Sequence, residues 1–168
     1  MDEGTAQYDK SADNGSSWTS WGAIQPELAR SARALLADLL GQLTPQRPLP
    51  VERAVLAPSR LPSEVRDRLV AVVGEAAVLD DNAARARHAG GQSYSDLVRR
   101  RRGDASEAPD AIVTPATADE VGDVLRICSD GQVAVVPWGG GTSVVGGLSA
   151  IGGGRRAVVA LDLGRMDR

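Results

Sequence analysis

The sequence is poor in the residue types that build most catalytic and metal sites. Among its 168 residues there is a single cysteine, Cys128, and a single histidine, His88. One cysteine excludes an internal disulfide framework and a CxxC metal site. One histidine argues against a histidine-based metal centre and a Ser-His-Asp triad. We therefore expect no metal, and we expect Cys128 to be a small buried side chain rather than a reactive thiol.

Aromatic residues, excess charge and long apolar runs are also scarce. Aromatics make up 3% and phenylalanine is absent, so the core must be built from alanine, valine and leucine. A net charge of −3 offers no general attraction to nucleic acid or to an anionic membrane. No apolar run approaches the roughly 20 residues of a membrane helix, and the acidic N-terminus lacks a secretory signal pattern. These absences predict a cytoplasmic protein with no transmembrane segment and no nucleic-acid partner.

Changes in composition along the chain predict three regions. Residues 1–20 are expected to form a disordered tail, residues 21–108 a mainly helical region, and residues 109–168 a compact unit of strands and one helix. Trp18 and Trp21 are expected to pack against the first helix. The helical region should contain, in order, a helix over 26–43, a proline-rich linker over 44–62 with at most a short strand near Val55, a helix over 63–73 capped by Ser63, and a polar loop over 80–92.

A short helix closed by arginines is expected at the end of the helical region. Ser93 and Asp96 match a capping-box pattern, with aspartate in place of glutamate. The last turn, residues 99–102, consists of four arginines, which complement the negative end of a helix. Two interpretations stay open for this run: a solvated helix end, or a clamp on an anionic substrate or a partner domain. His88, in the loop before, is expected to be structural or exposed, with a substrate contact as the alternative.

From residue 109 onward the pattern is that of a strand–helix–strand unit. Short apolar runs at 111–113 and 133–136 predict two parallel strands. Thr117 and Glu120 form a capping box for the helix between them, which ends at Gly131. The helix should turn Val121, Val124, Leu125 and Cys128 toward the core, and residues 157–161 predict a third strand. Since one such unit is not a full sheet domain, we expect the N-terminal part of a larger architecture, apparently truncated.

The most informative stretch is the glycine loop, residues 137–147, which lies between the second and third of these strands. Three consecutive glycines, Gly139–Gly141, remove the side chains that would keep a ligand from the main chain. They also let successive N–H groups point into one concavity, which suits a phosphate. Thr142 and Ser143 add hydroxyl groups beside them. The alternative interpretation is a flexible connection without a ligand.

Two common phosphate loops do not fit this stretch. The spacing from Gly141 to Gly146 matches a Walker A loop, but Gly147 and Leu148 stand where lysine and serine or threonine are needed. A dinucleotide-binding Rossmann loop starting at Gly139 would need its third glycine at Val144, and no helix pattern follows. What remains is a strand, a glycine loop and a strand, in which backbone amides must hold the phosphates.

The residues of the loop resemble a known flavoprotein family. Pro137-Trp138-Gly139-Gly140-Gly141-Thr142-Ser143, followed by Val144-Val145-Gly146-Gly147, is similar to the first flavin-diphosphate loop of the FAD-binding fold shared by p-cresol methylhydroxylase (PCMH) and vanillyl-alcohol oxidase. Residues 109–115 and 160–166 stand where that family has its opening and third strands. Trp21-Gly22 and the segments 85–88 and 91–97 resemble the alkylglycerone-phosphate synthase branch.

The resemblance implies an α+β fold, in which a helical N-terminal region precedes the first βαβ-β subdomain of a PCMH-type FAD-binding domain. It implies that FAD is bound by Pro137, Trp138, Gly139, Gly140, Gly141, Thr142 and Ser143, with Pro115 near the adenine side. Many relatives attach FAD through a histidine at the position that Thr142 occupies, so non-covalent FAD is expected.

The implied function is that of the N-terminal portion of a flavoenzyme similar to alkylglycerone-phosphate synthase. The alternatives are part of a flavin-dependent 2-hydroxy-acid dehydrogenase of the D-lactate or glycolate type, or an inactive truncated product. No residue of this chain is assigned a catalytic role, so we do not expect it to be catalytically complete by itself. The expected partners are FAD and the downstream FAD subdomain and cap domain of the family, and a homodimer stays open.

Overall fold

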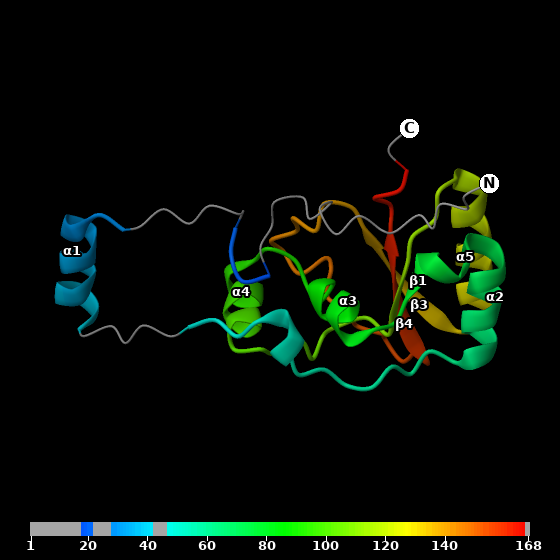
Figure 1. Cartoon of the computed structure of the whole chain (residues 1–168), viewed down its shortest axis with the longest axis horizontal. Helices are drawn as coiled ribbons and strands as arrows, with labels where there is room; N and C mark the ends of the chain where they lie inside the picture. Colours follow the sequence, from blue (N-terminus) through cyan, green and yellow to red (C-terminus); the bar gives the residue numbers. More distant parts are fainter. Residues whose placement is uncertain (1–17, 22–27, 42–46, 167–168) are drawn as a thin grey trace, which may run out of the picture.

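The computed structural model describes residues 18–21, 28–41 and 47–166 (Figure 1). Most of the expected tail and both ends of the first expected helix lie outside the described residues. In chain order the elements are α1 (Arg30–Leu40), η1 (Val51–Arg53), α2 (Ser63–Val73), η2 (Glu75–Ala77), β1 (Val78–Leu79), α3 (Asn82–Arg87), α4 (Tyr94–Arg101), β2 (Ala111–Val113), α5 (Ala118–Asp130), β3 (Val133–Trp138) and β4 (Ala157–Asp162).

The centre of the fold is a mixed sheet with the strand order β1-β2-β4-β3. β4 pairs in parallel with β2 on one side and with β3 on the other, so that Val159 lies opposite both Ala111 and Val135. The two strands of the expected βαβ unit are thus parallel, but the third strand inserts between them. β4 is buried along its whole length because it has neighbours on both sides. The α+β fold class expected from the sequence is confirmed.

Two helices cover one face of this sheet, and Figure 1 shows them side by side. α2 and α5 pack on each other, and their buried side chains Leu69 and Val124 join the sheet residues in one apolar cluster. The expected inward position of Leu125 is wrong, because this side chain is 45% exposed and Ile127 takes a place in the core instead. Val121, Val124 and Cys128 follow the 3.6-residue period, whereas Leu125 lies one position past the edge of that stripe.

α2 and α4 begin in two different ways. α2 starts at Ser63 as expected, but its cap position is Pro62 and no side chain caps the helix, so the expected Ser63 cap is wrong. At α4 the capping box is confirmed, because Ser93 accepts from the Asp96 amide and the Asp96 carboxylate accepts from the Ser93 amide. This reciprocal pairing satisfies two backbone donors that a short helix otherwise leaves free.

The expected polar loop over residues 80–92 is wrong in part, since it contains α3. Asp81 caps this helix by accepting from the amides of Ala83 and Ala84. The preceding strand β1 has only two residues, which is too short to give an alternating pattern in the sequence. α3 packs against η1 and β2, and its Ala86 enters a second apolar cluster. It thereby carries His88 to the end of the sheet where the strands β3 and β4 finish.

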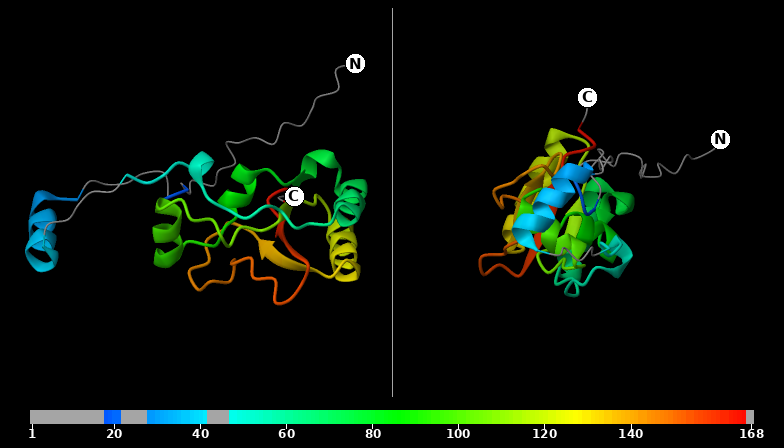
Figure 2. Two further views of the ribbon diagram at one scale, coloured as in Figure 1. Left: turned by 90° about the horizontal axis from the view of Figure 1, so that it is seen from below. Right: turned by 90° about the vertical axis from the view of Figure 1, so that its left-hand side faces the viewer.

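The N-terminal described residues do not pack as expected. Trp18 and Trp21 contact the region of α4 rather than α1: the Trp18 indole donates to the Leu49 carbonyl, and the Trp21 indole donates to the Gln92 carbonyl. α1 itself buries none of its residues, and Figure 2 shows it standing apart from the sheet and its helices. Among the described helices, none is long and apolar enough to cross a membrane.

Candidate functional site

The glycine loop begins where β3 ends, at the carboxyl end of the two longest parallel strands. Trp138 is the last residue of β3 and pairs with Asp162, the last residue of β4. The Leu163 amide donates to the Trp138 carbonyl at 2.9 Å, which extends the pairing to the first residue past β4. In open parallel sheets ligands bind outside the carboxyl ends of the strands, so the loop occupies a favourable position for a ligand.

The three consecutive glycines divide the loop into an open part and an anchored part. Gly139 and Gly140 are exposed, and a Cβ atom at Gly139 would meet no heavy atom within 4 Å. Gly141 is buried with φ at +67°, and a Cβ atom there would lie 2.7 Å from Cζ2 of Trp138. The backbone conformation and the space at Gly141 therefore both require glycine. The exposed stretch at Gly139, with open space beside it, is the part that a phosphate could approach.

The Trp138 side chain points into the protein and packs against Gly141 of the glycine loop. It is 8% exposed, and its ring centroid lies 4.6 Å from that of His88. His88 Nε2 lies 3.1 Å from Asp162 Oδ2, and Nδ1 lies 2.9 Å from the Ala84 carbonyl oxygen. His88 is thus structural and largely buried, not exposed. Trp138 was predicted to bind FAD, but its ring packs inside the protein in a cluster with His88 and Asp162.

At its other end the candidate phosphate segment is held by the stretch that precedes α4. The Gln92 amide donates to the Ser143 carbonyl at 2.6 Å. A Cβ atom at Gly91 would lie 2.1 Å from the same Ser143 oxygen, so the approach depends on the absence of a side chain at Gly91. Ser143 Oγ accepts from the Gly147 amide at 3.3 Å, which leaves its hydroxyl hydrogen for another acceptor. Thr142 is exposed in the same loop as the exposed residues Gly139 and Gly140.

The arginine run contributes internal contacts rather than a uniformly solvated helix end. Arg99 forms ion pairs with Asp96 and Glu107. The hydrogen bond from Arg99 lowers the pKa of Glu107, and the same two carboxylates raise the pKa of Arg99. Arg101 donates to the Thr19 carbonyl at 2.9 Å. The interpretation as a solvated helix end therefore fails for Arg99, whose contacts lie within the protein.

Several residues of this site were not identified from the sequence. Asp162 follows an apolar strand, a position typical of site residues in parallel sheets, and this signal could have pointed to it. Two consecutive glycines, Gly90 and Gly91, precede the capping box and could have indicated that another backbone segment passes close by. The local sequence does not show that this segment contains Ser143. The resemblance places Pro115 near the adenine side of FAD. Pro115 lies two residues after the end of β2 and is fully buried.

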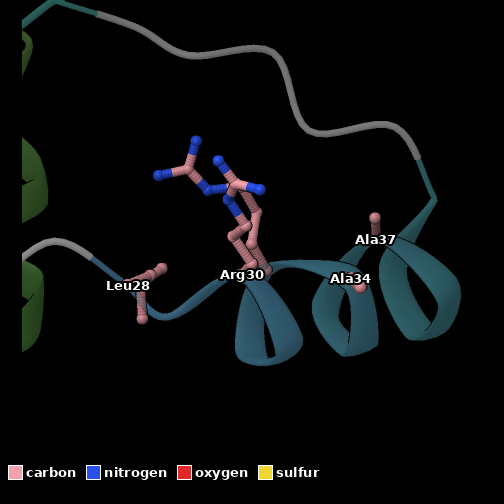
Figure 3. Close-up of a pocket in the computed structure, with 5 residues that line it drawn as sticks. Leu28, Arg30, Ala34 and Ala37 are labelled. Atoms are coloured by element: carbon pink, nitrogen blue, oxygen red, sulfur yellow. The ribbon is translucent and has the colours of Figure 1, made fainter.

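A surface hollow elsewhere in the molecule is not a second site. It is lined by Leu28, Arg30, Arg33, Ala34 and Ala37, all on α1 or next to its start, and Figure 3 shows the Arg30 side chain extending away from the helix. It offers no carboxylate, imidazole or thiol for acid–base or nucleophilic chemistry. Within the described ranges no cluster of three histidine, cysteine or acidic side chains could hold a metal ion.

Comparison with known proteins assigns the segment that contains the glycine loop. Residues 109–168 match the family described as FAD binding domain. Over 103 residues the chain is 37% identical to an alkyldihydroxyacetonephosphate synthase of Trypanosoma brucei brucei, covering 61% of this chain and 17% of that enzyme. It is 34% identical over 101 residues to protein Rv2250A of Mycobacterium tuberculosis, covering 58% of this chain and 68% of that protein. It is also 33% identical over 91 residues to glycolate oxidase subunit GlcD of Bacillus subtilis, covering 54% of this chain and 17% of that protein.

The fold is also similar to that of a solved alkyldihydroxyacetonephosphate synthase. That structure matches with a TM-score of 0.76 and 26% sequence identity, over 93% of this chain and 34% of that chain. The chain thus spans about a third of the solved synthase and a smaller part of the Trypanosoma enzyme. The segment that matches the FAD binding domain includes the glycine loop, in which Gly139 and Gly140 are exposed.

Proposed function

The chain belongs to the same family as protein Rv2250A, and its residues 109–168 match an FAD binding domain; on this premise we propose that its glycine loop holds the FAD diphosphate. The observation that carries the proposal is the division of the loop. Gly141 is anchored on Trp138, whereas Gly139 is exposed beyond the strand end with open space beside it. When bound, FAD supplies an electron-accepting ring, which no side chain of the protein offers.

The proposed contacts are those of backbone donors and hydroxyls. Amide groups of residues 139–143 would donate to the phosphate oxygens, and the exposed Thr142 hydroxyl would add a further donor. The loop contains no lysine or arginine that would neutralise the phosphates directly. Thr142 cannot form the histidine linkage that many relatives of this fold use. The proposal is therefore non-covalent FAD held by Pro137–Ser143.

The enzyme class that fits best is the alkyldihydroxyacetonephosphate synthase type, with this chain as its N-terminal portion. The likeness to the solved synthase extends over 93% of the chain and so includes much of the helical region before residue 109. A 2-hydroxy-acid dehydrogenase is the second candidate, because the likeness to glycolate oxidase subunit GlcD covers 54% of the chain. In either case we propose that the remaining FAD subdomain and the cap domain complete the cofactor site and supply the catalytic residues.

The test is a titration of the isotope-labelled chain with FAD, followed through the backbone amide signals in NMR spectra. Since the chain spans a small part of the Trypanosoma synthase, we expect a weak complex in which the signals of residues 139–143 move most. After acid precipitation all flavin should stay in the supernatant, as non-covalent binding requires. The same titration with ADP shows whether the nucleotide half of FAD is sufficient.

Two glutamate variants separate a local effect from a general one. Gly139→Glu places a carboxylate in open space next to the proposed phosphate position, so the fold should persist and the shifts caused by FAD should disappear. Gly122→Glu is the matched control, because Gly122 lies inside α5, where glutamate is a better helix former than glycine. Wild-type spectra in which residues 139–143 do not respond to FAD would contradict the proposal. Equal FAD affinity of the wild type and the Gly139→Glu variant would contradict it as well.

A further inference from the structure

Arg100 is a buried cation that forms no ion pair with a carboxylate among the residues that the structure describes. Its side chain is 4% exposed and lies in α4, on the side of the Gly91–Gln92 stretch. Nη2 donates to the Gly91 carbonyl at 2.5 Å and to Gln92 Oε1 at 3.3 Å, and the guanidinium lies 5.8 Å from the Trp18 ring centroid. Among the described residues Nε has no hydrogen-bond partner. Burial lowers the pKa of Arg100, and the neighbouring Asp96 carboxylate is already bound by Arg99.

Such an arrangement does not maximise stability. Removing a guanidinium from water is costly unless a carboxylate and further hydrogen bonds compensate for it. Arg100 is compensated by carbonyl-type oxygens and an aromatic ring, and its Nε donor has no partner within the described part of the chain. An apolar side chain of similar length would fill the same space without that cost. A role beyond packing therefore has to be sought in what the guanidinium contacts.

The peptide group that Arg100 binds is the same one that holds the glycine loop. This peptide group joins Gly91 and Gln92: its carbonyl oxygen accepts from Arg100, and its N–H donates to the Ser143 carbonyl at 2.6 Å. A cation at the oxygen end of a peptide polarises the group and strengthens the hydrogen bond that its N–H donates. This hydrogen bond fixes the Ser143 carbonyl and so holds the C-terminal end of the segment 139–143, whose amides are the proposed phosphate donors.

We propose that Arg100 is a positioning residue for the bound diphosphate, acting through the Gly91–Gln92 peptide on the carbonyl of Ser143 and so on the end of the phosphate-binding segment. This inference rests on the proposed FAD site, and it adds a residue outside the glycine loop that controls how tightly the site binds FAD. Arg100 does not touch the cofactor. Its charge holds the loop in the conformation in which the loop amides contact the phosphates. Because the loop is already ordered, binding of FAD loses less conformational entropy.

The decisive variant is Arg100→Met, because a positioning role predicts changes at Gln92 and in FAD binding that a role in packing alone does not. The variant removes a poorly compensated buried charge, but it also leaves the Gly91 carbonyl and Gln92 Oε1 without this donor. These two effects on the thermal midpoint oppose each other, so the local readouts at Gln92 and at the FAD site decide. Amide exchange at Gln92 should become at least about tenfold faster, because a hydrogen bond assisted by a charge is weakened. The dissociation constant for FAD, measured from the shifts of residues 139–143, should rise about fivefold or more.

Two further variants complete the design. Arg102→Met makes the same chemical change at an exposed position of the same arginine run and should leave both Gln92 exchange and FAD binding unchanged. Arg100→Lys keeps a cation near the Gly91 carbonyl and should fall between the wild type and Arg100→Met. A lysine variant as impaired as the methionine variant would assign the effect to shape and overturn the role of the charge.

The readouts also separate this inference from the proposed function. Faster Gln92 exchange in Arg100→Met with unchanged FAD affinity would overturn the positioning role while the FAD site stands. Wild-type protein that does not respond to FAD would overturn both the FAD site and the positioning role. Unchanged Gln92 exchange in Arg100→Met would overturn the relay through the peptide, whatever the FAD titration gives.

Discussion

His88 and Asp162 are 74 positions apart in the sequence, and their side chains meet at 3.1 Å beneath the start of the glycine loop. His88 comes from the end of α3, and Asp162 is the last residue of β4. The Trp138 ring packs on the imidazole, and Gly141 sits on that ring. The pair therefore connects the helical N-terminal region to the strand ends that carry the proposed cofactor loop.

Removing the imidazole should destabilise the protein. In His88→Ala the Asp162 Oδ2 atom and the Ala84 carbonyl lose their partner in a largely buried place, so we expect a loss of about 1–3 kcal/mol in the free energy of unfolding. Tryptophan emission should also change, because Trp138 loses the ring on which it packs. Urea unfolding followed by fluorescence gives both values. Arg87→Ala, an exposed change in the last turn of α3, is the control and should alter neither.

Alanine at the glycines of the loop should have position-dependent effects. Gly141→Ala introduces a strained backbone at φ +67° and a contact of 2.7 Å with Trp138, so we expect a loss of about 1–3 kcal/mol in unfolding free energy. Gly139→Ala adds a methyl group in open space and should change stability by less than about 0.5 kcal/mol. Denaturant unfolding of the two variants measures the difference. Equal losses at both positions would contradict the anchoring of the loop on Trp138.

The ion pairs of Arg99 should make stability depend on acid pH. Burial alone would raise the pKa of Asp96, but hydrogen bonds involving Ser93, Arg99 and Gly91 outweigh it and lower the pKa below its usual 3.8. The hydrogen bond from Arg99 likewise lowers the pKa of Glu107 below its usual 4.5. The folded protein therefore keeps these carboxylates charged at a pH where the unfolded chain is protonated, and unfolding takes up protons.

The sign of the effect follows from this difference. The stabilising contribution is complete above pH 4.5 and is lost as the pH falls through the lowered values of the folded protein. Arg99→Met should be less stable than the wild type by about 1–3 kcal/mol at neutral pH, and the difference should shrink toward pH 3. Thermal midpoints of both proteins between these pH values provide the measurement. A difference that does not change with pH would exclude the carboxylates as its source.

Local sequence signals predicted the elements whose causes are local. The bounds of α2, the capping box of Ser93 and the strands that flank the glycine loop were all predicted, because periodicity and capping act within a few residues. Leu125 was misplaced because the width of a buried stripe depends on the partner of the helix. α3 and β1 were missed because six and two residues carry too little pattern.

The sequence by itself determined that a glycine loop without lysine follows a strand, and that no histidine is present in it. These facts depend only on residue types and their order, and they argued against a Walker A loop; flavin itself was indicated by the resemblance of the loop to a flavoprotein family. Only the tertiary structure decided that the Trp138 ring turns toward His88 and that Arg100 reaches Ser143 through one peptide group. The His88–Trp138 and Gln92–Ser143 contacts join residues 50 and 51 positions apart, and such pairings are selected by the packing of α3, α4 and the sheet as a whole rather than by any local preference.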